Sequence, residues 1–249
     1  MSSLAHITYG IHAVSMLLDK NPNQVRCLYV SRDASNPRIH RLIEKAKTHR
    51  IRYESQTNQQ LQSRCGHDKH QGVAALTEAP DQTRSLDQLL NQDNRKLFLL
   101  VLDGVMDPHN LGACIRTASA AGVDAVIIPK DNAVQVNATV KKVACGAADI
   151  LPVFTVTNLA RTLTALKHAG LWLVGTCDQA QQSLYETTLT GSIAFVMGSE
   201  DKGLRRLTME HCDYVVKLPM ASAVSSLNVS VATGVCLYEK VRQERLYHQ

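Results

Sequence analysis

The feature that most constrains the fold of this 249-residue chain is a set of short, continuous apolar runs in its last two-thirds. They lie at residues 96–102, 125–128, 171–175, 193–197 and 214–218. Runs of this kind mark strands buried on both faces, as in parallel sheets. Helical patterns lie between them, near 110–121, 137–146, 157–168 and 201–211. This alternation predicts an α/β domain with a mostly parallel sheet and helices on both faces.

The first third of the chain predicts a second, smaller α/β module. Residues 9–19 show an amphipathic helical pattern, and a further helix opens at Pro37 with apolar residues at helical spacing. Strands are expected at 27–30, 51–53 and 72–76. Residues 78–94 are polar and resemble a linker with a short helical piece at 86–90. We therefore expect domains at 1–77 and 95–249, joined by this linker.

The positive charge of the chain is confined to the first of these domains. Residues 1–77 hold 11 Lys and Arg against 5 Asp and Glu, whereas residues 78–249 hold 16 against 17. A basic module joined to a neutral one suggests docking to a polyanion such as RNA, with the chemistry placed elsewhere. Because Lys and Arg favour any surface, a solvated basic helix is the alternative.

Several classes of protein are excluded or disfavoured by what the sequence lacks. No apolar run approaches the length needed to cross a bilayer, and the first residues do not resemble a secretion signal. The seven cysteines form no CxxC pair, which predicts reduced thiols in a cytoplasmic protein. The stretch 67–70 contains two His residues but no third or fourth ligand, so no metal is expected. The glycine patterns of serine hydrolases and of NAD-dependent oxidoreductases are also missing.

Ligands of open α/β sheets collect at the carboxyl ends of the strands, and the first candidate strand end is residues 103–116. Asn110 is expected to cap the following helix. Arg116 follows one to two turns later, where Gly112 and Ala113 leave room around the guanidinium. Such an arginine could bind a phosphate bidentately, or it could be a surface residue paired with an acid.

The second strand end, residues 195–206, places Glu200 between Gly198 and Gly203. This pattern predicts a bend at which a ligand approaches the backbone. The alternative is an ordinary strand-to-helix turn capped by Ser199.

The third strand end, residues 218–235, breaks at Pro219 into small and hydroxyl-bearing residues and then resumes as a helix. Free backbone N–H groups at such a helix start can bind a ligand, although a Ser-rich turn that merely caps the helix is equally consistent. Ser226, Ser230 and Gly234 are spaced four apart. This small-residue stripe suits a subunit interface, or packing onto the chain's own sheet.

Together, the three segments resemble the three motifs of the SpoU/TrmH branch of the SPOUT RNA methyltransferases. The matching residues are 107–112 with Arg116, then 197–203, then 218–220 with 225–230. Residues 9–14 and 70–73 resemble the two ends of the family's small L30e-like RNA-binding domain. Residues 137–148 are similar to the members that act as bacterial 23S rRNA (guanosine-2′-O)-methyltransferases.

The resemblance implies a fold and an activity. The expected fold is a SPOUT α/β domain with a C-terminal trefoil knot, preceded by the L30e-like domain, in an obligate homodimer. The expected reaction is transfer of a methyl group from S-adenosylmethionine to the ribose 2′-hydroxyl of a guanosine in the peptidyl-transferase P loop of 23S rRNA.

The same resemblance implies site residues. Those expected to contact the methyl donor are Gly198, Leu218 and Leu227. Those expected on the catalytic or substrate side are Asn110, Arg116, Glu200, Ser226 and Asn228. The chain departs from the family pattern at Asp201 and Ser222, where glycine is usual, and at Ala223, where a hydroxyl is usual.

The family assigns activation of the ribose hydroxyl to the arginine that corresponds to Arg116. An arginine side chain keeps its proton in proteins, because its pKa lies above about 12. We therefore expect Arg116 to stabilise the developing alkoxide and to hold the adjacent phosphate. Two other readings stay open: a related enzyme that acts on tRNA or another rRNA ribose, and a non-catalytic rRNA-binding assembly factor.

Overall fold

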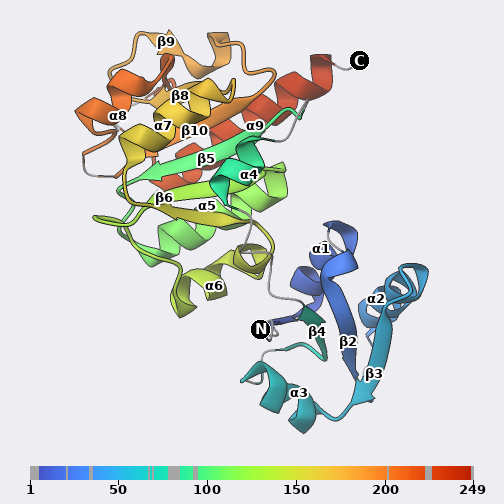
Figure 1. Cartoon of the computed structure of the whole chain (residues 1–249). Coiled ribbons are helices and arrows are strands. Elements are labelled where there is room, and N and C mark those ends of the chain that lie inside the picture. Colours follow the sequence, from blue (N-terminus) through green and yellow to red (C-terminus); the bar gives the residue numbers. More distant parts are fainter. Residues whose placement is uncertain are drawn as a thin grey trace. The chain divides into compact units, whose positions relative to one another are not determined.

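The structure is a computed structural model that describes residues 6–20, 22–33, 36–66, 68, 70–77, 85–91, 95–200, 202–221 and 226–247. The chain divides into two compact units (Figure 1). The first comprises residues up to 83 together with the short segment 145–150, and the second comprises the rest. The departures from the family pattern at Asp201, Ser222 and Ala223 lie outside the described residues.

The first unit is built on a four-stranded mixed sheet with strand order β1-β4-β2-β3. Strand β4 runs antiparallel to β1 and β2, and β3 runs parallel to β2. Side chains of β2 alternate between two cores: Leu28 and Val30 pack with α1 and α2, whereas Cys27 and Tyr29 pack with Leu61 of α3. Its elements are β1 (His6–Tyr9), α1 (Ile11–Lys20), β2 (Val25–Ser31), α2 (Pro37–Thr48), β3 (Arg52–Gln56), α3 (Asn58–Cys65) and β4 (Val73–Thr77), with a 3-10 turn at Pro22–Gln24.

The second unit contains a seven-stranded sheet with strand order β7-β6-β5-β10-β8-β11-β9, and every described strand pair in it is parallel. Its strands are β5 (Phe98–Asp103), β6 (Ala125–Pro129), β7 (Val153–Val156), β8 (Trp172–Thr176), β9 (Gln182–Ser183), β10 (Ile193–Gly198) and β11 (Tyr214–Lys217). Its helices are α4 (Leu86–Leu90), α5 (Pro108–Ala121), α6 (Ala138–Ala144), α7 (Leu159–His168), α8 (Arg206–His211) and α9 (Val229–Tyr247). Further 3-10 turns lie at Ala147–Asp149 and Leu184–Glu186.

Helices cover both faces of this sheet (Figure 1). Leu99 and Val101 of β5 belong to the core that also holds Leu163 and Leu166 of α7. Phe98 points to the opposite face, where the Lys240 ammonium of α9 lies 5.1 Å from the centre of its ring. Helix α9 packs there beside α5, which also contacts α6. The prediction of a mostly parallel α/β sheet with a smaller N-terminal α/β unit is therefore confirmed.

Some element boundaries differ from the prediction. Helix α5 begins at Pro108, and its cap is Asp107, whose carboxylate accepts the His109 N–H, so Asn110 is not the cap. The helix expected over 201–211 begins only at Arg206. No helix of the described residues is long and apolar enough to cross a membrane.

Candidate functional site

Three loops meet at the carboxyl edge of the seven-stranded sheet. Strands β5 and β10 are neighbours, and their last residues, Asp103 and Gly198, are paired across the ladder. Asn110 lies in the first turn of α5 after β5, Glu200 follows β10, and Asn228 immediately precedes α9 after β11. Because parallel strands end at the same edge, residues up to 118 positions apart in sequence come into hydrogen-bond contact here.

The polar side chains of these three loops form one hydrogen-bonded cluster. The Asn110 Nδ2 donates to Glu200 Oε1 over 2.5 Å. The Asn228 Nδ2 donates to the same oxygen over 2.5 Å and to Asn110 Oδ1 over 3.1 Å. Three of the predicted substrate-side residues are thus brought together. The second carboxylate oxygen of Glu200, Oε2, forms no hydrogen bond with the described residues and is open to a ligand.

The orientation of the Asn228 carboxamide is set by Ser230. Both the backbone N–H and the hydroxyl of Ser230 donate to Asn228 Oδ1, over 2.9 and 2.6 Å. Asn228 therefore caps α9 and must direct its NH₂ group toward Glu200 and Asn110. The sequence predicted Ser230 as part of a packing stripe, and its bond to Asn228 was missed. A polar residue two positions after an Asn at a helix start is the pattern that could have revealed it.

The loop after β10 folds back on the end of its own strand. Ser199 and Gly203 form an antiparallel bridge with two backbone hydrogen bonds of 2.9 and 3.1 Å. A Cβ atom at Gly198 would lie 2.0 Å from the Gly203 carbonyl carbon, so glycine is required there by close backbone approach. Ser199 closes this bend and does not cap α8, whose N-cap is Arg205.

Asp103, the last residue of β5, contacts two residues that follow this bend. The sequence did not predict this role. Its side chain is fully buried, and its Oδ2 accepts a hydrogen bond of 2.7 Å from the Thr208 hydroxyl of α8. Its Oδ1 lies 3.5 Å from the Arg205 guanidinium and has no hydrogen-bond partner in the described part of the chain. The sequence pattern that could have indicated this role is a carboxylate at the end of a continuous apolar run. A buried charge needs hydrogen-bond or ion-pair partners.

Arg116 is exposed on α5, and its guanidinium forms no ion pair or hydrogen bond with the residues that the structure describes. Among the described residues, no acid pairs with it as the alternative reading expects. The explanation given for Gly112 was wrong: a Cβ there would lie 2.7 Å from Val143 Cβ, so glycine serves the close packing of α6. Helix α5 is joined to α9 by a contact of 3.6 Å from Cys114 Sγ to the Thr233 hydroxyl.

The remaining predicted residues lie on the segments that flank the cluster. Leu218 follows β11 and is half-buried, while Ser226 and Leu227 are exposed and precede α9. Gly198 is the buried last residue of β10. None of these four donates or accepts a side-chain hydrogen bond in the described structure, and their roles stay predictions.

Burial changes the pKa of three cysteine thiols of the second unit. Burial raises the pKa of the Cys114 thiol to about 11, so the thiol beside the cluster is protonated at neutral pH. The same cause raises the pKa of Cys212 and Cys236 to about 12. The described residues contain no group of three or more possible metal-ligating side chains. Of the stretch 67–70, His67 lies outside the described residues, and His70 Nδ1 accepts the Gly72 N–H within a turn.

A parallel α/β sheet with a polar cluster from three loops at its carboxyl edge defines a ligand-binding α/β protein. Comparison with known families narrows this class. Residues 97–238 match the SpoU rRNA Methylase family, and residues 7–83 match the description RNA 2′-O ribose methyltransferase substrate binding. The chain belongs to the SpoU rRNA methylase family, which confirms the resemblance seen in its three motifs.

Relatives and solved structures agree with this assignment. The 23S rRNA (guanosine-2′-O-)-methyltransferase RlmB of Pseudomonas putida is 50% identical over 249 residues, covering 99% of each chain. RlmB of Escherichia coli K12 is 46% identical over 249 residues, covering 96% of this chain and 99% of the relative. The crystal structure of the SpoU methyltransferase AviRb from Streptomyces viridochromogenes with the cofactor AdoMet has a TM-score of 0.68 and 26% identity, covering 98% of this chain and 91% of that one.

Proposed function

We propose that this protein transfers a methyl group from S-adenosylmethionine to the ribose 2′-hydroxyl of a guanosine in 23S rRNA. The observation that carries the proposal is the Asn110–Glu200–Asn228 cluster, in a chain half identical to RlmB over its whole length. The finer assignment, a guanosine of the peptidyl-transferase P loop, rests on the sequence resemblance.

The segments beside the cluster suit the methyl donor. Leu227 and Met220 expose 38% and 37% of their surface there, and Leu218 is half-buried. Apolar side chains left open beside a polar cluster fit a purine ring with a polar tail. When bound, S-adenosylmethionine supplies the methyl group. Gly198, Leu218 and Leu227 are the residues proposed to hold it.

The chain's own residues then have to bind the ribose and stabilise the negative charge that develops on its 2′-oxygen. A hydroxyl is a weak nucleophile until its proton leaves. The free Oε2 of Glu200 is suited to accept a hydrogen bond from a ribose hydroxyl, with Asn110 and Asn228 holding the carboxylate in place. Arg116, which keeps its proton, would stabilise negative charge on the 2′-oxygen and bind the adjacent phosphate, and Ser226 would contact the ribose.

Three further parts of the proposal concern partners and location. We infer that the basic first unit binds the rRNA, because it carries the chain's excess of positive charge. The active form would be a homodimer, joined through the side of α9 that exposes Val231 and Tyr238. The cytoplasm is the proposed compartment, since no disulfide joins the seven cysteines and the proposed substrate is ribosomal RNA.

The test is methyl transfer from labelled donor to unmethylated 23S rRNA, followed by mapping of the modified nucleotide. We expect a single 2′-O-methylguanosine, and we expect Arg116→Lys to lower turnover by about 10²-fold or more, because lysine cannot form the bidentate contact. Label that enters tRNA instead would favour the related tRNA enzyme. Near-normal turnover of Arg116→Lys would exclude a specific role for the guanidinium.

A further inference from the structure

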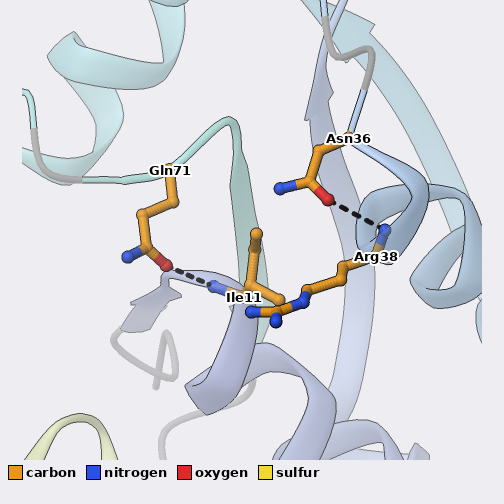
Figure 2. A pocket seen from close by; sticks show the side chains of 4 residues that line it. All are labelled: Ile11, Asn36, Arg38 and Gln71. Atoms are coloured by element: carbon orange, nitrogen blue, oxygen red, sulfur yellow. Dashed lines mark hydrogen bonds between the residues drawn. The ribbon is translucent and has the colours of Figure 1, made fainter.

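The first unit contains a cavity of about 320 Å³ at the starts of α1 and α2 (Figure 2). It is lined by Ile11, Asn36, Arg38 and Gln71. Small-ligand sites generally begin at about 300 Å³, so this volume suits one small group rather than a helix or a long chain segment.

The two carboxamides of the cavity have fixed orientations (Figure 2). Asn36 Oδ1 accepts the Arg38 N–H over 3.0 Å, and Gln71 Oε1 accepts the Ile11 N–H over 3.1 Å. Because both oxygens are engaged by backbone donors, the NH₂ groups remain available to donate to a ligand. Neither NH₂ group has a hydrogen-bond partner among the described residues. The cavity therefore presents donors and no free side-chain acceptor.

Arg38 adds an uncompensated positive charge to this set of donors. Figure 2 shows its side chain extending from α2 toward Ile11 of α1. Its guanidinium forms no ion pair with the described residues, although other cations of α2 do: Lys45 lies 2.7 Å from Asp19, and Lys47 lies 2.8 Å from Glu44. A guanidinium that lines the cavity and has no ion-pair partner among the described residues suits an anionic ligand, and phosphate matches its fork geometry.

We propose that this cavity holds one unpaired nucleotide of the RNA substrate. Arg38 binds the phosphate of the nucleotide, the NH₂ groups of Asn36 and Gln71 donate to acceptor atoms of the base, and Ile11 packs against its apolar surface. Proteins read RNA sequence mostly at unpaired nucleotides whose bases are splayed out, and guanine offers two adjacent acceptors, O6 and N7. This inference deepens the proposed function, on which it rests, by assigning a recognition site within the basic unit.

The test uses carboxylate variants of the intact chain that keep the fold. Asn36→Asp and Gln71→Glu retain the oxygen that accepts the backbone N–H, lose the NH₂ donors and add a negative charge at a helix start, where such charge is stabilising. The matched control is Gln59→Glu, which makes the same change at the start of α3, outside the cavity. Arg38→Ala is paired with Arg41→Ala, which removes an exposed arginine from the same helix.

Two binding measurements are made for each variant: one with a 23S rRNA transcript and one with a short, unstructured RNA of mixed sequence. We expect Asn36→Asp, Gln71→Glu and Arg38→Ala to weaken both by about tenfold or more, and Gln59→Glu and Arg41→Ala by about threefold or less. The two control variants, Gln59→Glu and Arg41→Ala, are expected to keep the turnover number of the wild type, and all five variants are expected to bind S-adenosylmethionine normally.

Equal losses in the cavity variants and in their controls would overturn the proposal, because they would show only attraction by net charge. Wild-type binding by Asn36→Asp and Gln71→Glu would overturn it as well. Failure of the proposed function is a separate outcome, since wild-type protein would then not methylate 23S rRNA, while the short RNA would still report on the cavity.

Discussion

At the scale of single residues, the hydrogen bonds of the cluster form a chain of donors that leads from Ser230 to Glu200. Ser230 donates twice to Asn228, Asn228 donates to Asn110 and Glu200, and Asn110 donates to Glu200. The NH₂ groups of Asn110 and Asn228 both donate to the same oxygen, Oε1 of Glu200. A hydrogen-bonded network of side chains holds its members in one arrangement only while each donor finds its acceptor. The position of Glu200 therefore depends on the amide of Asn228.

We expect Asn228→Asp to lower methyl transfer by about 10²-fold or more at neutral pH, with little change in melting temperature. The carboxylate still caps α9, but it replaces a donor to Glu200 with a second negative charge. When two carboxyl groups lie within hydrogen-bond distance, their repulsion raises the pKa of one of them. The protonated carboxyl group can then donate a hydrogen bond to the other. The loss should therefore shrink as the pH falls, which a pH profile of turnover measures.

A matched control is Asn158→Asp, because Asn158 caps α7 in the same way and contacts no residue of the cluster. This variant should keep normal turnover at every pH. Full activity of Asn228→Asp at neutral pH would contradict the role given to the network.

At the scale of elements, α9 combines three tasks along its length. Its first turn orients Asn228, as described above. Its last turns hold the loop before β10, where Gln243 and Glu244 accept the N–H groups of Leu189 and Gly191 over 2.8 and 2.9 Å. Between them, the inner side packs on the sheet and α5, and Val231 and Tyr238 remain 52% and 50% exposed on the outer side. Apolar side chains seven positions apart lie on the same side of a helix.

This exposed side leads to a prediction about assembly. We expect Tyr238→Glu and Val231→Glu to convert a dimer into monomers, because a charge on each partner would be buried in the interface. Sedimentation velocity measures the change. Leu207→Glu is the control, since Leu207 is an equally exposed apolar residue on α8. A wild-type protein that sediments as a monomer, or a Leu207→Glu variant that dissociates as well, would refute the assignment of this face.

The elements that the sequence predicted correctly are those with strong apolar patterns. All five apolar runs became strands, and β5, β6 and β10 are buried along their whole length, because continuous apolar segments are found where both faces of a sheet are covered. The elements that were missed have weak patterns. Strand β9 has only two residues, β7 lies at the sheet edge, and α3 buries Leu61 alone among polar residues. Their positions are set by neighbours distant in sequence, which no local pattern encodes.

At the site as well, some residues could be predicted from the sequence and others could not. The motifs predicted Asn110, Glu200 and Asn228 as substrate-side residues, and the parallel order of the strands explains why they meet. The sequence could not show that Asp107 takes the capping role, because Asp and Asn are both favoured caps and only the backbone decides between them. Nor could it show that Gly112 serves α6, since that contact joins two helices.

At the scale of the whole molecule, the excess of positive charge and the polar cluster fall on different units. The first 77 residues carry a net charge of +6, while residues 78–249 carry −1. The hydrogen-bonded cluster lies wholly in the second unit. Affinity for rRNA should therefore depend on salt mainly through the first unit, whereas binding of the methyl donor should depend on the second.

We expect a chain that lacks residues 1–77 to bind S-adenosylmethionine normally and to lose methyl transfer to rRNA. Ile150, which packs in the core of the first unit, should be replaced by Ser in this variant to avoid an exposed apolar side chain. Calorimetry measures donor binding, and circular dichroism confirms the fold. Undiminished methylation of rRNA by the shortened chain would disprove delivery by the first unit.

The parallel sheet also determines the order in which the protein can fold on the ribosome. Strand β5 is the first strand of its sheet to emerge, yet one of its two neighbours, β10, begins only at Ile193. Until then, one edge of a mostly apolar strand stays unpaired, and non-local pairing of this kind is slow. We therefore expect the nascent chain to be prone to aggregation until translation has passed residue 198, where β10 is complete and can pair with β5.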